Sequence, residues 1–158
     1  MSDRETFLEA LAPVLAVVAN VDPAAPGAAE RLAEALPLDG EVLTRVRALM
    51  RAGVEAGWLC DREAGGVRFS RVQKSVEGGL SIDAVHMSAP GGHTHPNGEI
   101  DLCFAVSGAP TFDGRAPGWT VYGPGSWHVP TVAGGVMDIL YFLPGGAMEF
   151  MAAPPRVG

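Results

Sequence analysis

Three of the four histidines in this chain stand in two short patterns that could bind a metal ion. The first pattern, residues 91–99, reads GGHTHPNGE. Because side chains alternate along a strand, His93 and His95 are expected on one face. The Pro-Asn-Gly turn then returns the carboxylate of Glu99 to that face. The second pattern, residues 124–128, reads PGSWH and brings a third imidazole, His128.

Three neutral imidazoles and one carboxylate suit one divalent metal ion, and Fe, Mn, Zn, Ni, Co and Cu all accept such ligands. Four protein ligands in an octahedral shell leave two positions for water or substrate, which favours a catalytic site over a closed structural one. In the alternative interpretation, His93 and His95 are surface-loop histidines and His128 packs in the core. A His-x-His followed four residues later by Glu is rare by chance in a chain with four histidines, so we prefer the metal site.

The composition changes near residue 61, which divides the chain into a helical part and a strand-rich part. Residues 1–60 hold 4 of the 21 glycines and 4 of the 13 prolines. Ser2 with Glu5 forms a capping box that predicts a first helix, which Pro13 could kink or divide. A second helix is expected over residues 28–36. Asp39 is expected to cap a third helix that ends at Gly57.

After Gly57 the apolar period changes from helical to alternating, which predicts short strands. A hairpin is expected where residues 64–66 separate residues 58–61 from residues 67–72. Further strands are expected over residues 80–87, 99–106, 119–122, 137–143 and 147–151. Many short strands with Gly and Pro turns predict a mainly β fold, a sandwich or barrel.

Charge and length exclude several classes of protein. The chain has 158 residues, with 18 acidic and 11 basic side chains and a net charge of -7, so a nucleic-acid partner is not expected. The longest apolar run is too short to span a bilayer, so no membrane partner is expected. Two cysteines fit a reduced protein, and the first five residues do not resemble a secretory leader, so we expect a cytoplasmic protein.

The two histidine patterns resemble the two motifs of the cupin superfamily. The resemblance implies that His93, His95, Glu99 and His128 are metal ligands inside a cupin-type antiparallel β-barrel or jelly roll. It divides the chain into an N-terminal helical segment (residues 1–60), a cupin barrel (61–153) and a tail (154–158). The match departs from the motifs at three points, which mark a divergent member: Gly108 stands two places late, one residue is missing before Gly125, and Val132 replaces an expected Asn.

A narrower resemblance covers most of the chain. The helical segment is followed by residues 93–99, 118–120, 124–130, 134–135 and 140–145, a set similar to the bacterial 4-hydroxylaminobenzoate lyase family. This resemblance implies a metal-dependent lyase that converts 4-hydroxylaminobenzoate, or a related small aromatic substrate, to 3,4-dihydroxybenzoate and ammonia. The alternatives are another metal-dependent cupin enzyme, a dioxygenase or an isomerase, or a non-catalytic cupin that binds small molecules. Cupins frequently dimerise, so a homodimer is expected.

Two residues are candidates for moving protons in such a reaction. Asp101 follows Glu99 by two residues and should share its face, where it could act as an acid or base or hold a histidine ligand. His86 shares a side with Ile82 and Ala84 and could be an acid or base, although a packed, hydrogen-bonded histidine is the stronger alternative.

An aromatic carboxylate needs a cation and an apolar slot. Arg68 and Arg71 could supply the cation, because a planar guanidinium suits a carboxylate. Tyr122 and Trp127 could line the slot. The alternatives are solvated surface charges for the arginines and plain core positions for the aromatic residues.

Overall fold

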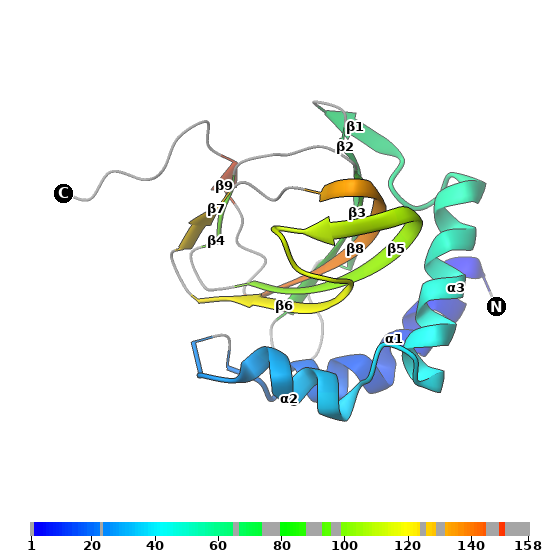
Figure 1. The fold of residues 1–158 in the computed structure, drawn as a ribbon. Helices are drawn as coiled ribbons and strands as arrows, with labels where there is room; N and C mark the ends of the chain where they lie inside the picture. The colour runs from blue at the N-terminus through cyan, green and yellow to red at the C-terminus, as the bar shows by residue number, and fades with distance from the viewer. Residues whose placement is uncertain are drawn as a thin grey trace.

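The computed structural model describes residues 2–22, 24–64, 67–73, 80–87, 93–95, 99–123, 126–128, 132–144 and 149–150. Within these ranges, the backbone alone is described for residues 64, 73, 80, 93–95, 126–128, 144 and 149–150. Figure 1 shows helices along one side of a curved sheet and a smaller group of strands at the far end of that sheet.

Three helices form the first part of the chain. The first helix, α1 (Asp3–Val18), is capped by Ser2, whose Oγ accepts a hydrogen bond from the backbone N–H of Glu5 at 3.1 Å, as predicted. Pro13 lies inside α1 without dividing it. The helix α2 (Ala28–Ala35) follows a turn, and α3 (Glu41–Ala56) ends at Gly57. Gly57 has a φ of 85°, the left-handed conformation that glycine adopts at a helix end, which confirms its predicted role.

Two local predictions in this part are wrong. Asp39 does not cap α3, because the N-cap is Gly40 and no side chain caps the helix. The predicted strand over residues 58–61 is also absent. Trp58 and Leu59 instead fold back, and both of their amides donate to the carbonyl of Gly53 at 3.2 Å. The left-handed turn at Gly57 directs the chain toward that carbonyl, so the first strand begins later.

The strands form two antiparallel sheets. The six-stranded sheet has the order β1-β2-β3-β8-β5-β6, and the three-stranded sheet has the order β7-β4-β9. The sequence predicts an antiparallel barrel or jelly roll. The described strands form two antiparallel sheets and do not close into a barrel, because β1 and β6 remain edges of the larger sheet. Their bounds are β1 (Arg62–Ala64), β2 (Val67–Gln73), β3 (Leu80–Met87), β4 (His93–His95), β5 (Glu99–Phe112), β6 (Gly118–Tyr122), β7 (Ser126–His128), β8 (Val132–Pro144) and β9 (Glu149–Phe150).

The six-stranded sheet is buried on both faces. One face packs on the helices, and we call it the helix-facing face. Its buried sheet residues include Val72, Ile82, Ala84, Ile100, Leu102, Phe104, Leu140 and Phe142. The opposite face, which we call the inner face, carries a second apolar cluster: Val85, Met87, Cys103, Phe112, Val132, Met137, Ile139, Tyr141 and Leu143.

Polar contacts fix the helices to the sheet. The indole N–H of Trp119 donates to the carbonyl of Leu36 at 3.0 Å. The guanidinium of Arg47 donates to the carbonyl of Ala105 at 2.7 Å. Together with the shared apolar core, these bonds make the helices one layer of the same domain. Among the described residues, no helix combines the length and the apolar character that a membrane span requires.

Candidate functional site

The two histidine patterns lie on neighbouring antiparallel strands. His93 pairs with His128 across β4 and β7, and His95 pairs with Ser126. Direct cross-strand partners lie on the same face of a sheet, and so do residues two apart on one strand. Positions 93, 95 and 128 therefore share one face of the small sheet. The side chains of these three histidines lie outside the described residues.

The fourth predicted ligand, Glu99, lies at the start of β5 in the six-stranded sheet. It pairs there with Tyr122 across β5 and β6. The four predicted ligands are thus divided between the two sheets, three on the small sheet and one on the larger.

The start of β5 contains two wholly buried carboxyl groups. Glu99 and Asp101 are both 0% exposed. They lie on the inner face, because Asp101 pairs with Tyr141, a member of the inner apolar cluster. Burial raises the pKa of Asp101 well above its usual range, and the charge of Glu99 and a hydrogen bond with Glu99 raise it further. The two residues share a face, as the alternation along the strand predicts.

Asp101 stands in a row of polar residues that crosses four strands of the inner face. Tyr141 is its partner on β8, and Asp83 is the next residue along the row on β3. The row ends at Arg71 on β2, whose Nε lies 2.5 Å from Oδ1 of Asp83. Tyr141 is buried, and its burial and the charges of Asp101 and Glu99 raise its pKa above the usual range. The row links the predicted acid Asp101 to the predicted cation Arg71.

A tight turn brings another acid to the same face. Asp113 and Gly114 have φ angles of 50° and 80°, as in the two-residue type I′ turns for which Asp-Gly is a preferred pair. The turn is closed by two backbone hydrogen bonds between Phe112 and Arg115, of 2.8 and 2.9 Å. Asp113 accepts a hydrogen bond from the hydroxyl of Tyr122. Burial and this bond raise the pKa of Tyr122 above its usual range.

The charges around Asp101 fit a site that receives a cation. The charges that contribute most to the raised pKa of Asp101 come from two acids and a thiol: Glu99, Asp113 and Cys103. Buried carboxyl groups that cluster in this way need protons or a positive ion. The donor set of three imidazoles and a carboxylate is one that binds divalent transition metals. Among the side chains that the structure describes, no three His, Cys, Asp or Glu residues form a metal site.

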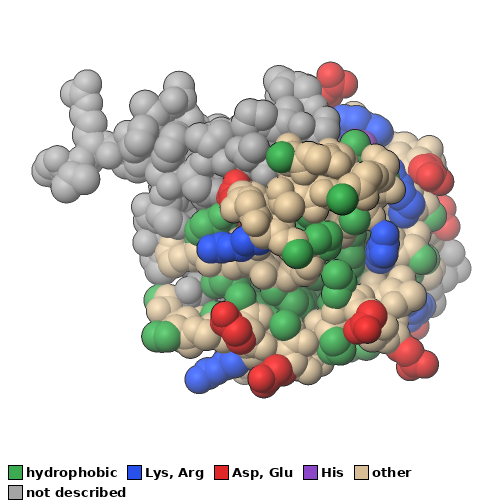
Figure 2. Space-filling model, in the orientation of Figure 1, with side chains coloured by type: hydrophobic (Ala, Val, Ile, Leu, Met, Phe, Trp, Pro, Cys, Tyr) green, Lys and Arg blue, Asp and Glu red, His purple; other side chains and the backbone are tan. Residues whose placement is uncertain are grey.

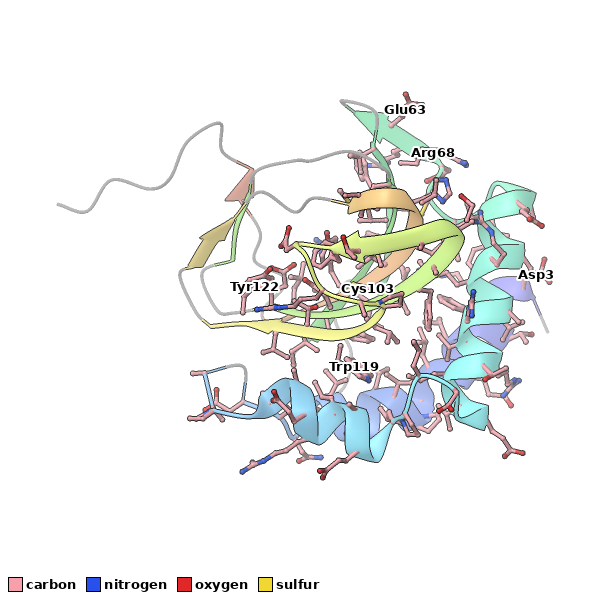
Figure 3. All side chains as sticks on the ribbon, viewed as in Figure 1. Asp3, Glu63, Arg68, Cys103, Trp119 and Tyr122 are labelled. Atoms are coloured by element: carbon pink, nitrogen blue, oxygen red, sulfur yellow. The ribbon has the colours of Figure 1, made fainter. Side chains whose placement is uncertain are left out.

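The structure separates His86 and Arg68 from this group. Residues 82 and 84 of β3 belong to the helix-facing core, and His86 continues that side. Its Nδ1 lies 2.7 Å from Oδ1 of Asp138, and Arg51 of α3 lies 3.2 Å from Oδ2 of the same carboxylate. Arg68 is the cross-strand partner of His86 and so shares its face. Figure 3 shows Arg68 well apart from Cys103 and Tyr122.

Of the other candidates, Tyr122 lies on the inner face, because it is the cross-strand partner of Glu99. Position 127 lies on the opposite face of the small sheet from position 128. The side chain of Trp127 is outside the described residues. Asp83, Asp113 and Tyr141 also belong to the site region. Tyr141 falls within the segment 140–145 of the lyase resemblance, whereas no sequence motif marks Asp83 or Asp113. The Asp-Gly pair at Asp113 signals a turn, but the three-dimensional path of β5 is needed to bring that turn beside Tyr122.

Comparisons with known proteins identify the family of the chain. A sequence profile of the family described as 4-hydroxylaminobenzoate lyase matches residues 9–150. The chain is 32% identical over 128 residues to a 4-hydroxylaminobenzoate lyase from Nocardioides sp. (strain LMS-CY). The aligned region covers 73% of this chain and 76% of the relative.

Solved structures bear on the fold alone. The chain is similar to the DMSP lyase DddQ from Ruegeria pomeroyi DSS-3, with a TM-score of 0.53, 18% identity, and coverage of 97% of this chain and 99% of that chain. It also aligns with an RmlC-like cupin protein from Ralstonia eutropha JMP134, with a TM-score of 0.43, 12% identity, and coverage of 60% and 65%. The predicted fold class, mainly antiparallel β with N-terminal helices, is confirmed, although the described sheet is open.

Proposed function

This chain belongs to the 4-hydroxylaminobenzoate lyase family, and from that membership we propose that it converts 4-hydroxylaminobenzoate, or a closely related small aromatic, to 3,4-dihydroxybenzoate and ammonia. The net reaction consumes one water and releases one ammonia. The N–O bond and the C–N bond break, and the ring gains two C–O bonds, so no external oxidant is required. The reaction therefore needs groups that move protons and a site that holds the ring in place.

The observation that carries the proposal is the match of the lyase family over residues 9–150. The ligands that we propose for one divalent metal ion are His93, His95, Glu99 and His128. Positions 93, 95 and 128 share one face of the small sheet, and Glu99 is wholly buried at the start of β5. When bound, such an ion would supply a Lewis acid for an oxygen of the substrate or of water. The identity of the metal does not follow from this donor set, since affinity for divalent ions follows the Irving–Williams order.

Asp101 is the residue that we propose to move the proton. It lies two residues after Glu99 on the same buried face, and burial and the charge of Glu99 raise its pKa. A raised pKa favours the protonated carboxyl group, which can donate its proton to a leaving oxygen. The hydroxylamine oxygen must be protonated as its bond to nitrogen breaks, and we propose that Asp101 supplies that proton.

The inner face also provides the apolar surroundings that exclude water from the reacting groups. Tyr141 and Cys103 flank Asp101 and are buried with it. A site from which water is excluded strengthens the electrostatic effect of each charged group. The apolar cluster of the inner face would thus hold the ring while the polar row handles protons.

The test is a turnover assay under argon. Purified protein is mixed with 4-hydroxylaminobenzoate, with and without a chelator, and 3,4-dihydroxybenzoate and ammonia are quantified. We expect both products in equal amounts and without oxygen, and we expect their formation to fall after the metal is removed and to return when it is restored. Protein that holds metal but forms neither product would contradict the proposed reaction.

A further inference from the structure

The charge on the inner face presents a difficulty for an anionic substrate. Glu99, Asp101 and Asp113 act on the same buried region, and each can carry a negative charge. A benzoate that approached these acids would be repelled unless a cation held its carboxylate. The sequence suggests Arg68 or Arg71 for this task, but the structure gives both another environment. Arg68 lies on the helix-facing side, and Arg71 is already paired with Asp83 at 2.5 Å.

Arg115 is placed by the tight turn at the edge of the same face. The two backbone hydrogen bonds between Phe112 and Arg115 fix the start of its side chain. Its guanidinium carbon lies 5.5 Å from the centre of the Tyr122 ring. Tyr122 is in turn the cross-strand partner of Glu99. Arg115 is thus a positive charge separated from the proposed metal ligand Glu99 by one aromatic ring.

The way in which Arg115 is held leaves its hydrogen-bond donors available. A guanidinium that stacks on an aromatic ring uses its face, and its N–H edge remains able to bind a carboxylate through two parallel bonds. No carboxylate oxygen of the described residues lies within the 4.0 Å of an ion pair with Arg115, whereas Arg71 forms such a pair with Asp83. This difference favours Arg115 over Arg71 as the cation for a ligand.

Solvent can reach Arg115 through a hollow between α2 and the edge strand β6. The hollow has a volume of about 350 Å³ and is lined by Arg115, Trp119, Val121 and Glu30, together with Ala25, Gly27, Ala28 and Ala29. Figure 2 shows apolar side chains gathered in the hollowed region between the sheet and the helices. Trp119 and Val121 pack with the helix-facing core, so the hollow lies on the helix-facing side of β6, whereas Tyr122 lies on the inner face. Arg115 is exposed and stands at the edge between the two sides, where a benzoate on the inner face can reach its guanidinium.

We propose that Arg115 is a specificity-determining residue that binds the carboxylate of the aromatic substrate while the ring of Tyr122 orients the guanidinium. The inference rests on the proposed function for the identity of the substrate. It requires only that the ligand be a small aromatic carboxylate. Arg115 selects such acids over otherwise identical molecules that lack the carboxylate, because a neutral analogue gains nothing from the cation.

The test measures binding and turnover with matched pairs of molecules. The affinities of 4-aminobenzoate and aniline are measured by titration calorimetry for the wild type and for Arg115→Gln, Arg71→Gln and Arg45→Gln. Arg45 is an exposed arginine on α3 and serves as the control. We expect Arg115→Gln to weaken 4-aminobenzoate binding about tenfold, as for the loss of a charge-assisted pair, and to leave aniline binding unchanged. The control should bind both as the wild type does.

Turnover separates this inference from the proposed function. In Arg115→Gln, the ratio of kcat/KM for 4-hydroxylaminobenzoate to kcat/KM for phenylhydroxylamine should fall about tenfold, mainly through KM. Unchanged 4-aminobenzoate binding in folded Arg115→Gln, or a larger loss in Arg71→Gln, would overturn the assignment of Arg115 while leaving the lyase proposal intact. A wild type that binds 4-aminobenzoate through Arg115 but forms no product would refute the lyase and support the carboxylate site.

Discussion

Two buried aspartates lie on neighbouring strands of one sheet, face opposite ways, and have opposite surroundings. Asp138 of β8 points to the helices and is 2% exposed, and Asp101 of β5 points to the inner face and is 0% exposed. Asp138 has His86 at 2.7 Å and Arg51 at 3.2 Å. The groups that act on Asp101 are instead Glu99, Cys103 and Asp113, and each of them raises its pKa.

Under the proposed function, Asp138 is a structural carboxylate and Asp101 is a functional one. Asp138 joins α3, β3 and β8 through a complete set of partners, so its charge is compensated inside the protein. The charges that raise the pKa of Asp101 are those of acids and a thiol, and such a group is a candidate for binding a cation or carrying a proton. Removing each carboxylate should therefore affect a different property of the protein.

The largest expected effect is on turnover in Asp101→Asn. We expect kcat to fall about 100-fold or more, because an amide cannot supply the proton. The free energy of unfolding of the metal-free protein should stay the same or rise, since the substitution removes a buried ionisable group that lies next to another acid. Assays of product formation and urea unfolding measure the two quantities. If Asp101→Asn loses stability but keeps the wild-type kcat, Asp101 is a structural group and not a catalytic one.

The second effect is on stability in Asp138→Asn. Loss of this charge leaves Arg51 and His86 without their shared partner, and we expect a loss of about 2–3 kcal/mol in the free energy of unfolding. The value is at the low end for a buried pair because the side chains of Arg51 and His86 are 26% and 22% exposed. Urea unfolding measures it, with exposed Asp39→Asn as the matched control. A fall in kcat for folded Asp138→Asn would argue for a catalytic role of this group.

A third effect concerns the thiol of Cys60 on the helix-facing side. Burial, together with the charge of Asp138, raises the pKa of Cys60 from 9.0 to about 12. Between pH 9 and 12 the unfolded chain loses the thiol proton and the folded chain keeps it, so stability falls as the pH rises. The slope from this group is at most about 1.4 kcal/mol per pH unit. Unfolding curves should show a shallower decline in Cys60→Ala, and equal slopes in both proteins would contradict the assignment.

The smallest effect is expected at the start of α1. Ser2→Ala removes the side-chain acceptor for the N–H of Glu5, and we expect a loss of about 0.5–1 kcal/mol in the free energy of unfolding. Turnover should not change, because this cap belongs to the helical layer and is remote from the inner face. Thermal unfolding and the product assay together measure this. A change in kcat as large as that in Asp101→Asn would mean that the two layers are not independent.

The sequence predicts which residues share a face but not which face is the inner one. Alternation along β5 correctly groups Asp101 with Glu99, and alternation along β3 correctly groups His86 with Ile82 and Ala84. Both sides of β3 are apolar, because helices cover one and the second cluster covers the other. Alternation therefore cannot say that His86 faces the helices, and the pairing with Asp138 requires the three-dimensional structure.

The helix ends show a similar limit. Ser2 with Glu5 is a local signal whose effect needs only three residues, and the predicted cap is present. Asp39 is also a good capping residue, but Gly40 follows it and adopts the N-cap conformation instead. The environment of Arg115 is a further example. Its position beside Tyr122 depends on the course of a 14-residue strand that no local pattern specifies.

The place of β8 in the sheet has a consequence for synthesis on the ribosome. This strand pairs with β3 on one side and with β5 on the other, although it follows both in the sequence. The sheet therefore cannot assemble until residues 132–144 have left the exit tunnel. Until then the nascent chain exposes the apolar sides of α1, α3 and β3, which makes it a natural client for chaperones during translation. Slower translation before β8 would prolong that exposure and favour aggregation.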